Sequence, residues 1–282
     1  MSHYNIPKFD LDSIGDGSVT GIVGRRGSGK TSILDHLLYV KRRIPDGIGC
    51  SGSEESNGNL SKRIPCSFVF SDYNRDAIKQ AYTRARQQNA IRRKSGLPKK
   101  FTFIILDDVA YDKNFTSDPL IKEIFFNGRH NGVFFVFTLQ YAMCVKPDLR
   151  AQIDYVFLCR EPIQKNRKKL WENYAGVIPT FKEFEDIMDR VCVDYRCLVI
   201  AQNKVSGNIE DSVFWFKADT NLPEFKMGSQ VYWRKHYERF NPHYDEDDNE
   251  YGEASVAGVH YEAVPKRKNS KQKYVTSVKL LN

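Results

Sequence analysis

A segment near the N-terminus combines the residue types that bind phosphate, at a spacing suited to that chemistry. Residues 24–31 read GRRGSGKT and match the pattern G-x-x-x-x-G-K-[ST] in full. Glycines let backbone N–H groups come close to phosphate oxygens, the lysine adds a charge for the β and γ phosphates, and the threonine hydroxyl is a ligand for Mg²⁺. The nucleotide-binding residues predicted here are Gly24, Arg25, Arg26, Gly27, Ser28, Gly29, Lys30, Thr31 and Ser32, with Lys30 also catalytic and Thr31 at the metal.

Two carboxylates follow an apolar run of β-branched and aromatic residues. The run, FTFIIL, spans residues 101–106, and Asp107 and Asp108 come directly after it. A parallel α/β sheet binds ligands at the carboxyl ends of its strands, so both acids are expected at the ligand-binding edge. We predict that Asp107 holds Mg²⁺, directly or through water, and that Asp108 polarises the attacking water. An aspartate in the second role is one methylene shorter than the glutamate usual in many ATPases.

The next apolar run, residues 133–138, has a polar residue after it and an arginine before it. Gln140 follows the run and is expected at the same edge, where it contacts the γ-phosphate or orients the water. Arg129 precedes the run. Because six extended residues span ~20 Å, Arg129 is expected at the opposite edge of the sheet from the nucleotide of its own subunit. From there it can act as an arginine finger on a neighbouring subunit in a ring.

Strands and helices must alternate to position these residues. Continuous apolar runs alternating with helical patterns predict an α/β P-loop NTPase, a mainly parallel sheet covered on both faces. Residues 46–63 are rich in Gly, Ser and charge and are expected to form a surface loop. Strands are predicted at 18–23, 66–70, 101–106, 133–138 and 155–159, a hairpin at 195–201 with 213–217, and helices after the glycine-rich loop and at 75–94, 119–127, 164–174 and 181–190.

The chain changes character near residue 240. Beyond that point an acidic and then a basic segment contain too few apolar residues to pack a core. We therefore expect an ATPase domain over residues 1–239 and a disordered, charged tail over 240–282.

Positive charge is concentrated in one stretch. The net charge is +8, and residues 75–100 hold nine basic residues against one acid. Such a block suits a polyanion such as DNA, to which the basic segment of the tail would add; a solvated helix face is the alternative. The six cysteines show no CxxC pair and no disulfide framework, and no apolar run approaches the ~20 residues that span a bilayer. We expect a soluble, intracellular protein that is not secreted.

The segments GRRGSGKT, FTFIILDD and FNGRHNGVFFVFTLQY, in this order, resemble the DNA-packaging ATPases of nucleocytoplasmic large DNA viruses, the poxvirus-type enzymes of the FtsK–HerA superfamily. The similarity spans residues 18–219, and LRAQIDYVFLCRE and IEDSVFWFKAD also resemble members from algal and giant viruses. The resemblance implies an additional-strand fold related to RecA, with one strand between those of the Walker A and Walker B motifs. It also implies a ring homo-oligomer, a pentamer or hexamer, that uses ATP and Mg²⁺ to pump double-stranded DNA into a preformed capsid.

The same resemblance implies roles for single residues and for partners. Lys30 and Thr31 correspond to the ATP and Mg²⁺ positions, Asp107 to the Walker B metal carboxylate and Asp108 to the water-activating acid. Gln140 corresponds to the sensor and Arg129 to the arginine finger. Implied partners are capsid or internal-membrane portal proteins, at virus assembly sites in the host cytoplasm and in association with the virion. Leu139 departs from the family pattern, in which Thr or Ser often precedes the sensor, and the basic helix matches no family motif.

Three other readings compete with the motor. A GTPase is excluded, because Ser206 stands where guanine recognition requires Asp and Ala110 replaces the glycine of the DxxG switch. A small-molecule kinase and a nucleotide-gated binding module of the capsid with slow hydrolysis stay open. Stimulation of the ATPase by DNA would separate the motor from both. Packaging and another DNA-transfer role are not separated by the sequence.

Overall fold

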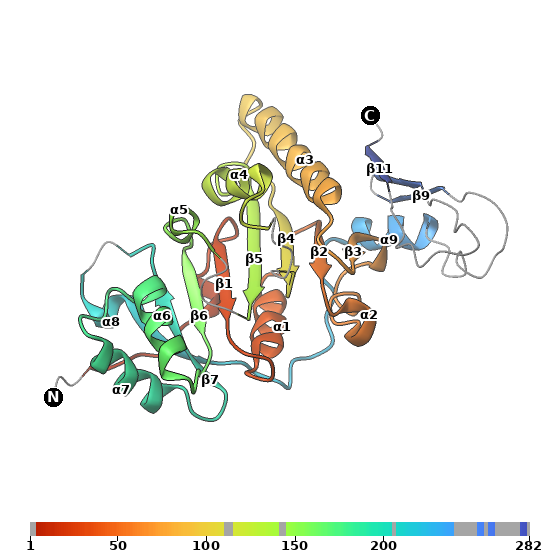
Figure 1. The fold of residues 1–282 in the computed structure, drawn as a ribbon. Helices are drawn as coiled ribbons and strands as arrows, with labels where there is room; N and C mark the ends of the chain where they lie inside the picture. The colour runs from red at the N-terminus through yellow and green to blue at the C-terminus, as the bar shows by residue number, and fades with distance from the viewer. Residues whose placement is uncertain are drawn as a thin grey trace.

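The computed structural model describes residues 4–109, 115–140, 145–204 and 207–239, together with the backbone of three short strands beyond them. One eight-stranded sheet, in the order β3-β2-β4-β5-β1-β6-β7-β8, forms its centre (Figure 1). The strands are β1 (Val19–Val23), β2 (Gly47–Ser51), β3 (Val69–Phe70), β4 (Thr102–Asp107), β5 (Val133–Leu139), β6 (Tyr155–Leu158), β7 (Arg196–Ala201) and β8 (Val213–Lys217). The first six in this order run parallel, and β7 and β8 are each antiparallel to the strand before them. The predicted α/β fold, with its terminal antiparallel pair, is confirmed.

The order of the central strands sets the position of the predicted site. β5 lies between β1, which leads into the glycine-rich loop, and β4, which ends at Asp107. This is the arrangement that the resemblance implies. Every residue of β1, β4 and β5 is buried, because helices cover both faces of the sheet, and continuous apolar runs are the sequence pattern of such strands.

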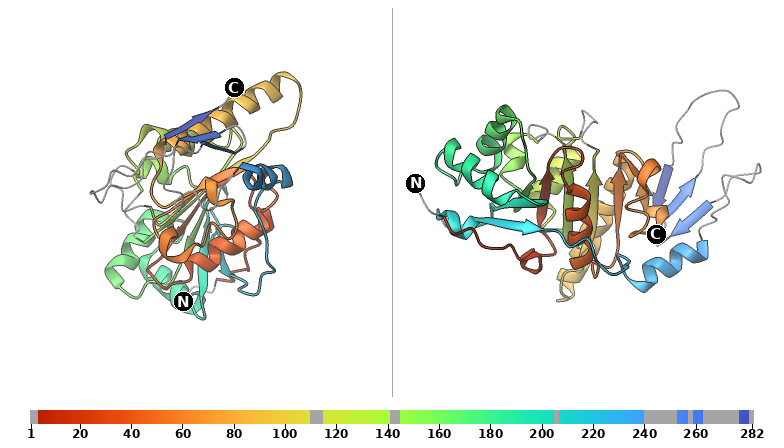
Figure 2. Two further views of the ribbon diagram at one scale, coloured as in Figure 1. Left: turned by 90° about the vertical axis from the view of Figure 1, so that its right-hand side faces the viewer. Right: turned by 90° about the horizontal axis from the view of Figure 1, so that it is seen from below.

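Helices lie on both faces of the sheet, with α1 on one face and α4, α6 and α7 on the other (Figure 2). Phenylalanine rings from β5 and α4 interlock between the layers: the ring centroids of Phe125 and Phe135 lie 5.2 Å apart, and those of Phe125 and Phe137 lie 5.4 Å apart. The helices are α1 (Lys30–Val40), α2 (Glu54–Asn57), α3 (Arg75–Lys94), α4 (Pro119–Asn127), α5 (Pro147–Arg150), α6 (Gln164–Tyr174), α7 (Phe181–Val191), α8 (Ile209–Ser212) and α9 (Gln230–Arg239), with 3-10 turns at Leu11–Ser13 and Cys66–Phe68.

The prediction of a surface loop over residues 46–63 is wrong at its start. Gly47–Ser51 forms β2, a fully buried strand between β3 and β4. Its glycines give close packing instead of a turn: a Cβ at Gly47 would lie 2.2 Å from the carbonyl oxygen of Phe103, and one at Gly49 would lie 2.8 Å from Leu60. Glycine inside a strand often marks such a close approach, but composition alone reads it as a loop signal.

Two further segments differ from the expectation. The strand predicted at 66–70 is a 3-10 turn at Cys66–Phe68 followed by the two-residue β3. Helix α9 was not predicted; it packs on the sheet through Tyr232, whose hydroxyl donates to the carbonyl of Gly47 at 2.7 Å.

Beyond α9 the structure gives the backbone of an antiparallel sheet of β9 (Glu253–Val256), β10 (Val259–Glu262) and β11 (Ser277–Leu280). The other residues of the expected tail lie outside the described part of the chain, so the disordered tail stays a prediction. Ala110 and Ser206, on which the exclusion of a GTPase depends, also lie outside it. In the part of the chain that is described, no helix has the length and apolar character needed to cross a membrane.

Candidate nucleotide-binding site

The glycine-rich loop connects β1 to α1 and has the conformation that its glycines permit. Gly27 and Gly29 have φ angles of 77° and 92°, in the left-handed region that favours glycine. Gly24 packs closely against Cys159, the residue that follows β6: a Cβ at Gly24 would be 2.5 Å from Oγ of Ser28 and 2.6 Å from Cβ of Cys159. Other side chains at these positions would force the loop to change shape, so the pattern seen in the sequence has a structural reason.

Lys30, the first residue of α1, folds back over the loop. Its ammonium group donates hydrogen bonds to the carbonyl oxygens of Gly24 at 2.7 Å and Arg25 at 3.0 Å. Burial lowers the pKa of Lys30, against the opposing effect of negative groups that include Asp107 and Asp108. A half-buried ammonium at the N-terminus of a helix favours an anionic ligand, because phosphate oxygens replace the lost hydration.

Asp107 ends β4 as a buried carboxylate, with 5% of its surface exposed. Its Oδ1 accepts a hydrogen bond from the hydroxyl of Thr138 at 2.7 Å, and its Oδ2 accepts one from Ser51 at 3.4 Å. Burial raises the pKa of Asp107, and these hydrogen bonds offset part of the rise. Neutral donors leave a buried carboxylate short of positive charge, so a divalent cation fits here, with Thr31 as the second oxygen ligand in the same cavity.

Asp108 and Gln140 contact each other directly. The side-chain amide of Gln140 donates to both carboxylate oxygens of Asp108, at 2.8 and 2.7 Å. The backbone at Asp108 has a φ of 51°, a left-handed conformation that is uncommon for a residue other than glycine. Gln140 was expected at the γ-phosphate or the attacking water; here it orients the carboxylate predicted to polarise that water.

Thr138 forms hydrogen bonds with both Asp107 and Asp108, and the sequence pattern did not predict it as a site residue. Its hydroxyl donates to Asp107 and accepts a hydrogen bond from the backbone N–H of Asp108 at 2.9 Å. The side chain is buried, with 1% exposed. The available signal was a hydroxyl-bearing residue near the end of an otherwise apolar strand, two positions before Gln140. Such a residue needs a buried hydrogen-bond partner, which the strand pairing supplies.

One cavity of about 970 Å³ joins most of the predicted residues. Gly24, Arg25 and Ser28 shape the loop without lining this cavity: the carbonyl of Arg25 accepts from Lys30 and from Oγ of Ser28 at 2.7 Å. Other lining residues, which the sequence did not single out, include Gly52, Ser53, Tyr195, Lys217, Ala218 and Thr220. The predicted residues that line it are Arg26, Gly27, Gly29, Lys30, Thr31, Ser32, Asp107, Asp108 and Gln140.

Arg129 lies at the opposite edge of the sheet, as its place before β5 predicts. Its guanidinium forms an ion pair with Asp154, and the other oxygen of that carboxylate accepts from the backbone N–H of Val19 at 2.8 Å. Val19 begins β1, so these residues mark the amino ends of the strands. The Arg129 side chain is 58% exposed, and it holds Asp154 within its own subunit.

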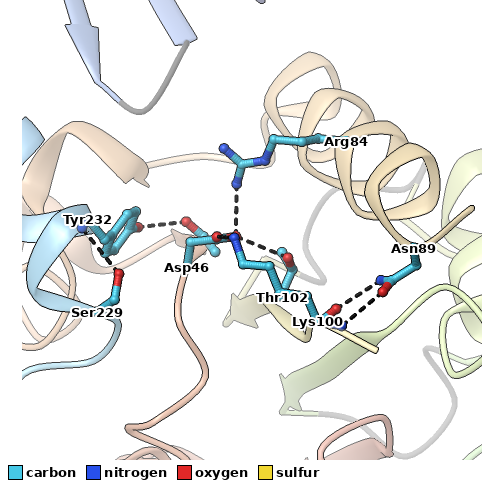
Figure 3. Close-up of polar contacts among 8 residues, drawn as sticks. Asp46, Arg84, Asn89, Lys100, Thr102, Ser229 and Tyr232 are labelled. Carbon is cyan, nitrogen blue, oxygen red and sulfur yellow. Dashed lines mark hydrogen bonds and ion pairs between the residues drawn. The ribbon is translucent and has the colours of Figure 1, made fainter. Parts of the chain in front are cut away.

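Part of the basic block at residues 75–100 is neutralised within the fold. Figure 3 shows Asp46 accepting from Arg84 at 3.0 Å, Lys100 at 2.6 Å and the hydroxyl of Thr102 at 3.0 Å. Arg75 pairs with Asp118, and Arg86 pairs with Glu123. Within the described residues, the basic side chains of the block that form no ion pair are Lys79, Arg92, Arg93, Lys94 and Lys99. All but Lys79 lie at the C-terminal end of α3 or in the loop after it.

Solved structures of a viral NTPase share this fold. The genome packaging NTPase B204 of Sulfolobus turreted icosahedral virus 2, in complex with AMP, matches with a TM-score of 0.52 and 17% identity over 73% of this chain and 100% of that one. The same protein in complex with sulfate matches with a TM-score of 0.51 and 15% identity, over 73% and 98% of the two chains. At these identities the likeness establishes the fold alone.

Sequence relatives come from viruses, whereas no protein-family model matches the chain. Protein 088R of Invertebrate iridescent virus 3 is 36% identical over 80% of this chain and 86% of its own length. Protein 015R of Frog virus 3 is 34% identical over 79% and 69% of the two chains, and protein L437 of Acanthamoeba polyphaga mimivirus is 30% identical over 86% and 87%. The chain therefore belongs to the family of viral proteins that includes 088R, 015R and L437.

Proposed function

We propose that this chain is an Mg²⁺-dependent ATPase that translocates double-stranded DNA and packages a viral genome into its capsid. One observation carries the ATPase part: a single cavity holds the phosphate-binding loop, the buried carboxylate of Asp107 and the Asp108–Gln140 pair. These are the groups that triphosphate hydrolysis needs, because that reaction depends on positioning and on charge stabilisation.

Each group has a distinct task in the proposed reaction. Backbone N–H groups of the loop and the ammonium of Lys30 hold the β and γ phosphates. Thr31 and Asp107 would hold Mg²⁺, which when bound neutralises charge on the phosphate oxygens. Asp108 orients the attacking water and accepts its proton, and Gln140 fixes the carboxylate in the direction of the cavity.

Three findings support DNA as the second substrate. B204, which shares the fold, is described as a genome packaging NTPase, and the sequence relatives are viral. Four of the five basic residues of the 75–100 block that form no ion pair among the described residues lie at the C-terminal end of α3 or in the loop after it, where a phosphate backbone can be bound without reading its bases. In this proposal the subunits form a ring, Arg129 acts on the nucleotide of a neighbour, and portal or capsid proteins at the virus assembly site receive the motor.

The test is the ATPase rate with and without double-stranded DNA, measured alongside the mass in solution. We expect DNA to raise the rate several-fold, in an assembly larger than a monomer. Lys30→Ala should abolish both rates, and the matched control Lys165→Ala, at an exposed lysine away from the cavity, should change neither.

The possible outcomes separate the alternatives. A monomer whose hydrolysis ignores DNA would contradict the motor and favour a small-molecule kinase or a slow, nucleotide-gated binding module. Normal hydrolysis by Lys30→Ala would contradict the site itself. DNA binding with a flat response to salt would contradict a phosphate-contacting surface, because counterion release makes such binding strongly salt-dependent.

A further inference from the structure

The cavity extends to both sides of β1, and the strand order determines which elements lie at each end of it. β4, with Asp107, lies on one side of β1, whereas β6, β7 and β8 lie on the other. The glycine-rich loop follows β1 and lies between these ends. A nucleotide whose terminal phosphates lie near Asp107 and whose phosphate chain crosses the loop must direct its base towards the β7–β8 side.

The antiparallel pair at that side brings two distant segments to the edge of the sheet where the loop lies. Because β7 runs antiparallel to β6, it begins at the carboxyl end of β6, and β8 ends beside it, with Arg196 opposite Lys217. Tyr195 immediately precedes β7, and residues 217–220 end β8 and follow it. Tyr195, Lys217, Ala218 and Thr220 line the same cavity as the loop.

Tyr195 is unusual both in the exposure of its aromatic ring and in its backbone conformation. It is 74% exposed, more than any other large hydrophobic side chain in the described ranges. Its φ is 59°, following a φ of 51° at Asp194, and a left-handed conformation is uncommon for a bulky residue. The ring lies over the end of the loop, since a Cβ built at Gly29 would be 3.5 Å from its Cδ1. Exposure and backbone strain together at a ligand cavity indicate a ring positioned for a ligand.

Residues 217–220, the second segment that lines this end of the cavity, contact α1 through Asp219. The backbone N–H of Asp219 donates to Nδ1 of His36 at 3.0 Å, and the His36 ring packs against Phe216, with centroids 5.5 Å apart. The carboxylate of Asp219 accepts from the backbone N–H of Asn221 at 2.8 Å. Asp219, in the middle of this segment, is therefore held in place before any ligand enters, which favours binding by lowering the cost of ordering.

We propose that this end of the cavity is the nucleobase subsite, where the purine of ATP stacks on the ring of Tyr195 and residues 217–220 form the facing wall. The inference rests on the proposed ATPase function and adds the base-binding half of its site. Stacking on an aromatic ring needs only a π face, so the ring contributes affinity for the base and none for the phosphates.

The experiment compares two ligands on the full chain by calorimetry with Mg²⁺ present: ATP, and inorganic triphosphate, which lacks the base and the ribose. Tyr195→Ala and Tyr195→Gly should each weaken ATP binding by about 5- to 150-fold, the range measured for loss of base–aromatic stacking. Neither should change triphosphate binding. Tyr195→Phe, which keeps the ring, should bind both ligands like the wild type.

Controls keep the inference separate from the proposed function. Glycine is favoured at a left-handed φ, so Tyr195→Gly relieves strain and a folding defect does not explain its weaker ATP binding. Lys30→Ala should weaken the binding of both ATP and triphosphate. Unchanged ATP affinity in Tyr195→Ala, or an equal loss for both ligands, would overturn the nucleobase subsite and leave the ATPase standing. A wild-type chain that binds neither ligand would overturn both.

Discussion

Two buried aspartates at opposite edges of the sheet have different partners. Asp46, just before β2, accepts from Arg84, Lys100 and Thr102, so two cations of the same chain neutralise it (Figure 3). Asp107, at the end of β4, accepts only from the hydroxyls of Thr138 and Ser51 among the hydrogen bonds of the described residues. Both residues are buried, with 8% of the surface of Asp46 and 5% of that of Asp107 exposed.

The difference indicates which edge of the sheet is built for a ligand. A buried charge is stable only with a compensating charge, and at Asp46 the chain provides it. At Asp107 the chain provides two hydroxyl donors and the nearby charge of Lys30 but no ion pair among the described residues, so the positive charge of a metal bound with a nucleotide fits there. The amino edge is therefore built to hold the fold together, and the carboxyl edge is built for binding.

Asp107→Asn should have one of the two largest effects on turnover. We expect turnover to fall about 1000-fold, because the metal loses its buried carboxylate, a loss of several kcal/mol in transition-state stabilisation. The substitution should not lower the free energy of unfolding. Burial raises the pKa of Asp107, so ionisation penalises the folded state above that pKa, and the penalty disappears below the unfolded value. The variant should thus equal or exceed the wild type in free energy of unfolding near pH 7, measured by denaturant titration. A marked loss of stability there would contradict the view that Asp107 serves binding and not the stability of the fold.

Arg129→Ala tests whether the amino edge also acts in catalysis. If Arg129 is an arginine finger in trans, its loss should lower turnover about 1000-fold and leave ATP affinity unchanged. Mutant subunits should then inhibit wild-type subunits in mixed rings. Arg86→Ala is the matched control, since Arg86 is 52% exposed and has one ion pair, as Arg129 does at 58%. Unchanged turnover in mixed assemblies would restrict this edge to a structural role.

Asp46→Asn should affect stability instead of chemistry. Removing the acid leaves Arg84, whose side chain is 14% exposed, without its carboxylate, and we expect a loss of about 3 kcal/mol in the free energy of unfolding. Glu123→Gln removes a more exposed partner, at 38%, and should cost less than about 1 kcal/mol. Denaturant titration measures both. Equal losses would mean that burial does not distinguish the two pairs.

Thr138→Val should lower turnover less than Asp107→Asn or Arg129→Ala does. The variant keeps the shape but loses the hydroxyl between the two acids, and we expect about tenfold lower turnover, as for one lost hydrogen bond to a charged group. Thr138 is a positioning residue, so the pH profile should change as well: without its donor the pKa of Asp107 rises further, and the acid limb moves to higher pH. Thr138→Ser should restore both readouts. Restored rate without a restored pH profile would argue against this coupling.

Sequence reasoning located the site but not the contacts inside it. The glycine-rich pattern, the acids after β4 and the residue after β5 all reach one cavity, because each is fixed by its place at the end of a strand. The contact of Gln140 with Asp108 was missed, since it depends on how β4 and β5 pair. β2 was missed for a different reason: its glycines are there for close packing against Phe103 and Leu60, and composition cannot distinguish such glycines from those of a turn.

The amino-acid sequence on its own determines most of the strands, the place of the phosphate-binding loop, and the polar groups that stand at strand ends, since burial patterns and backbone preferences are local properties. Tertiary structure alone decides which charges are already neutralised. It pairs Arg84 and Lys100 with Asp46 and gives Asp107 two hydroxyls, and it brings Tyr195 over Gly29 from far along the chain. Those contacts depend on strand order and register, which no local pattern encodes.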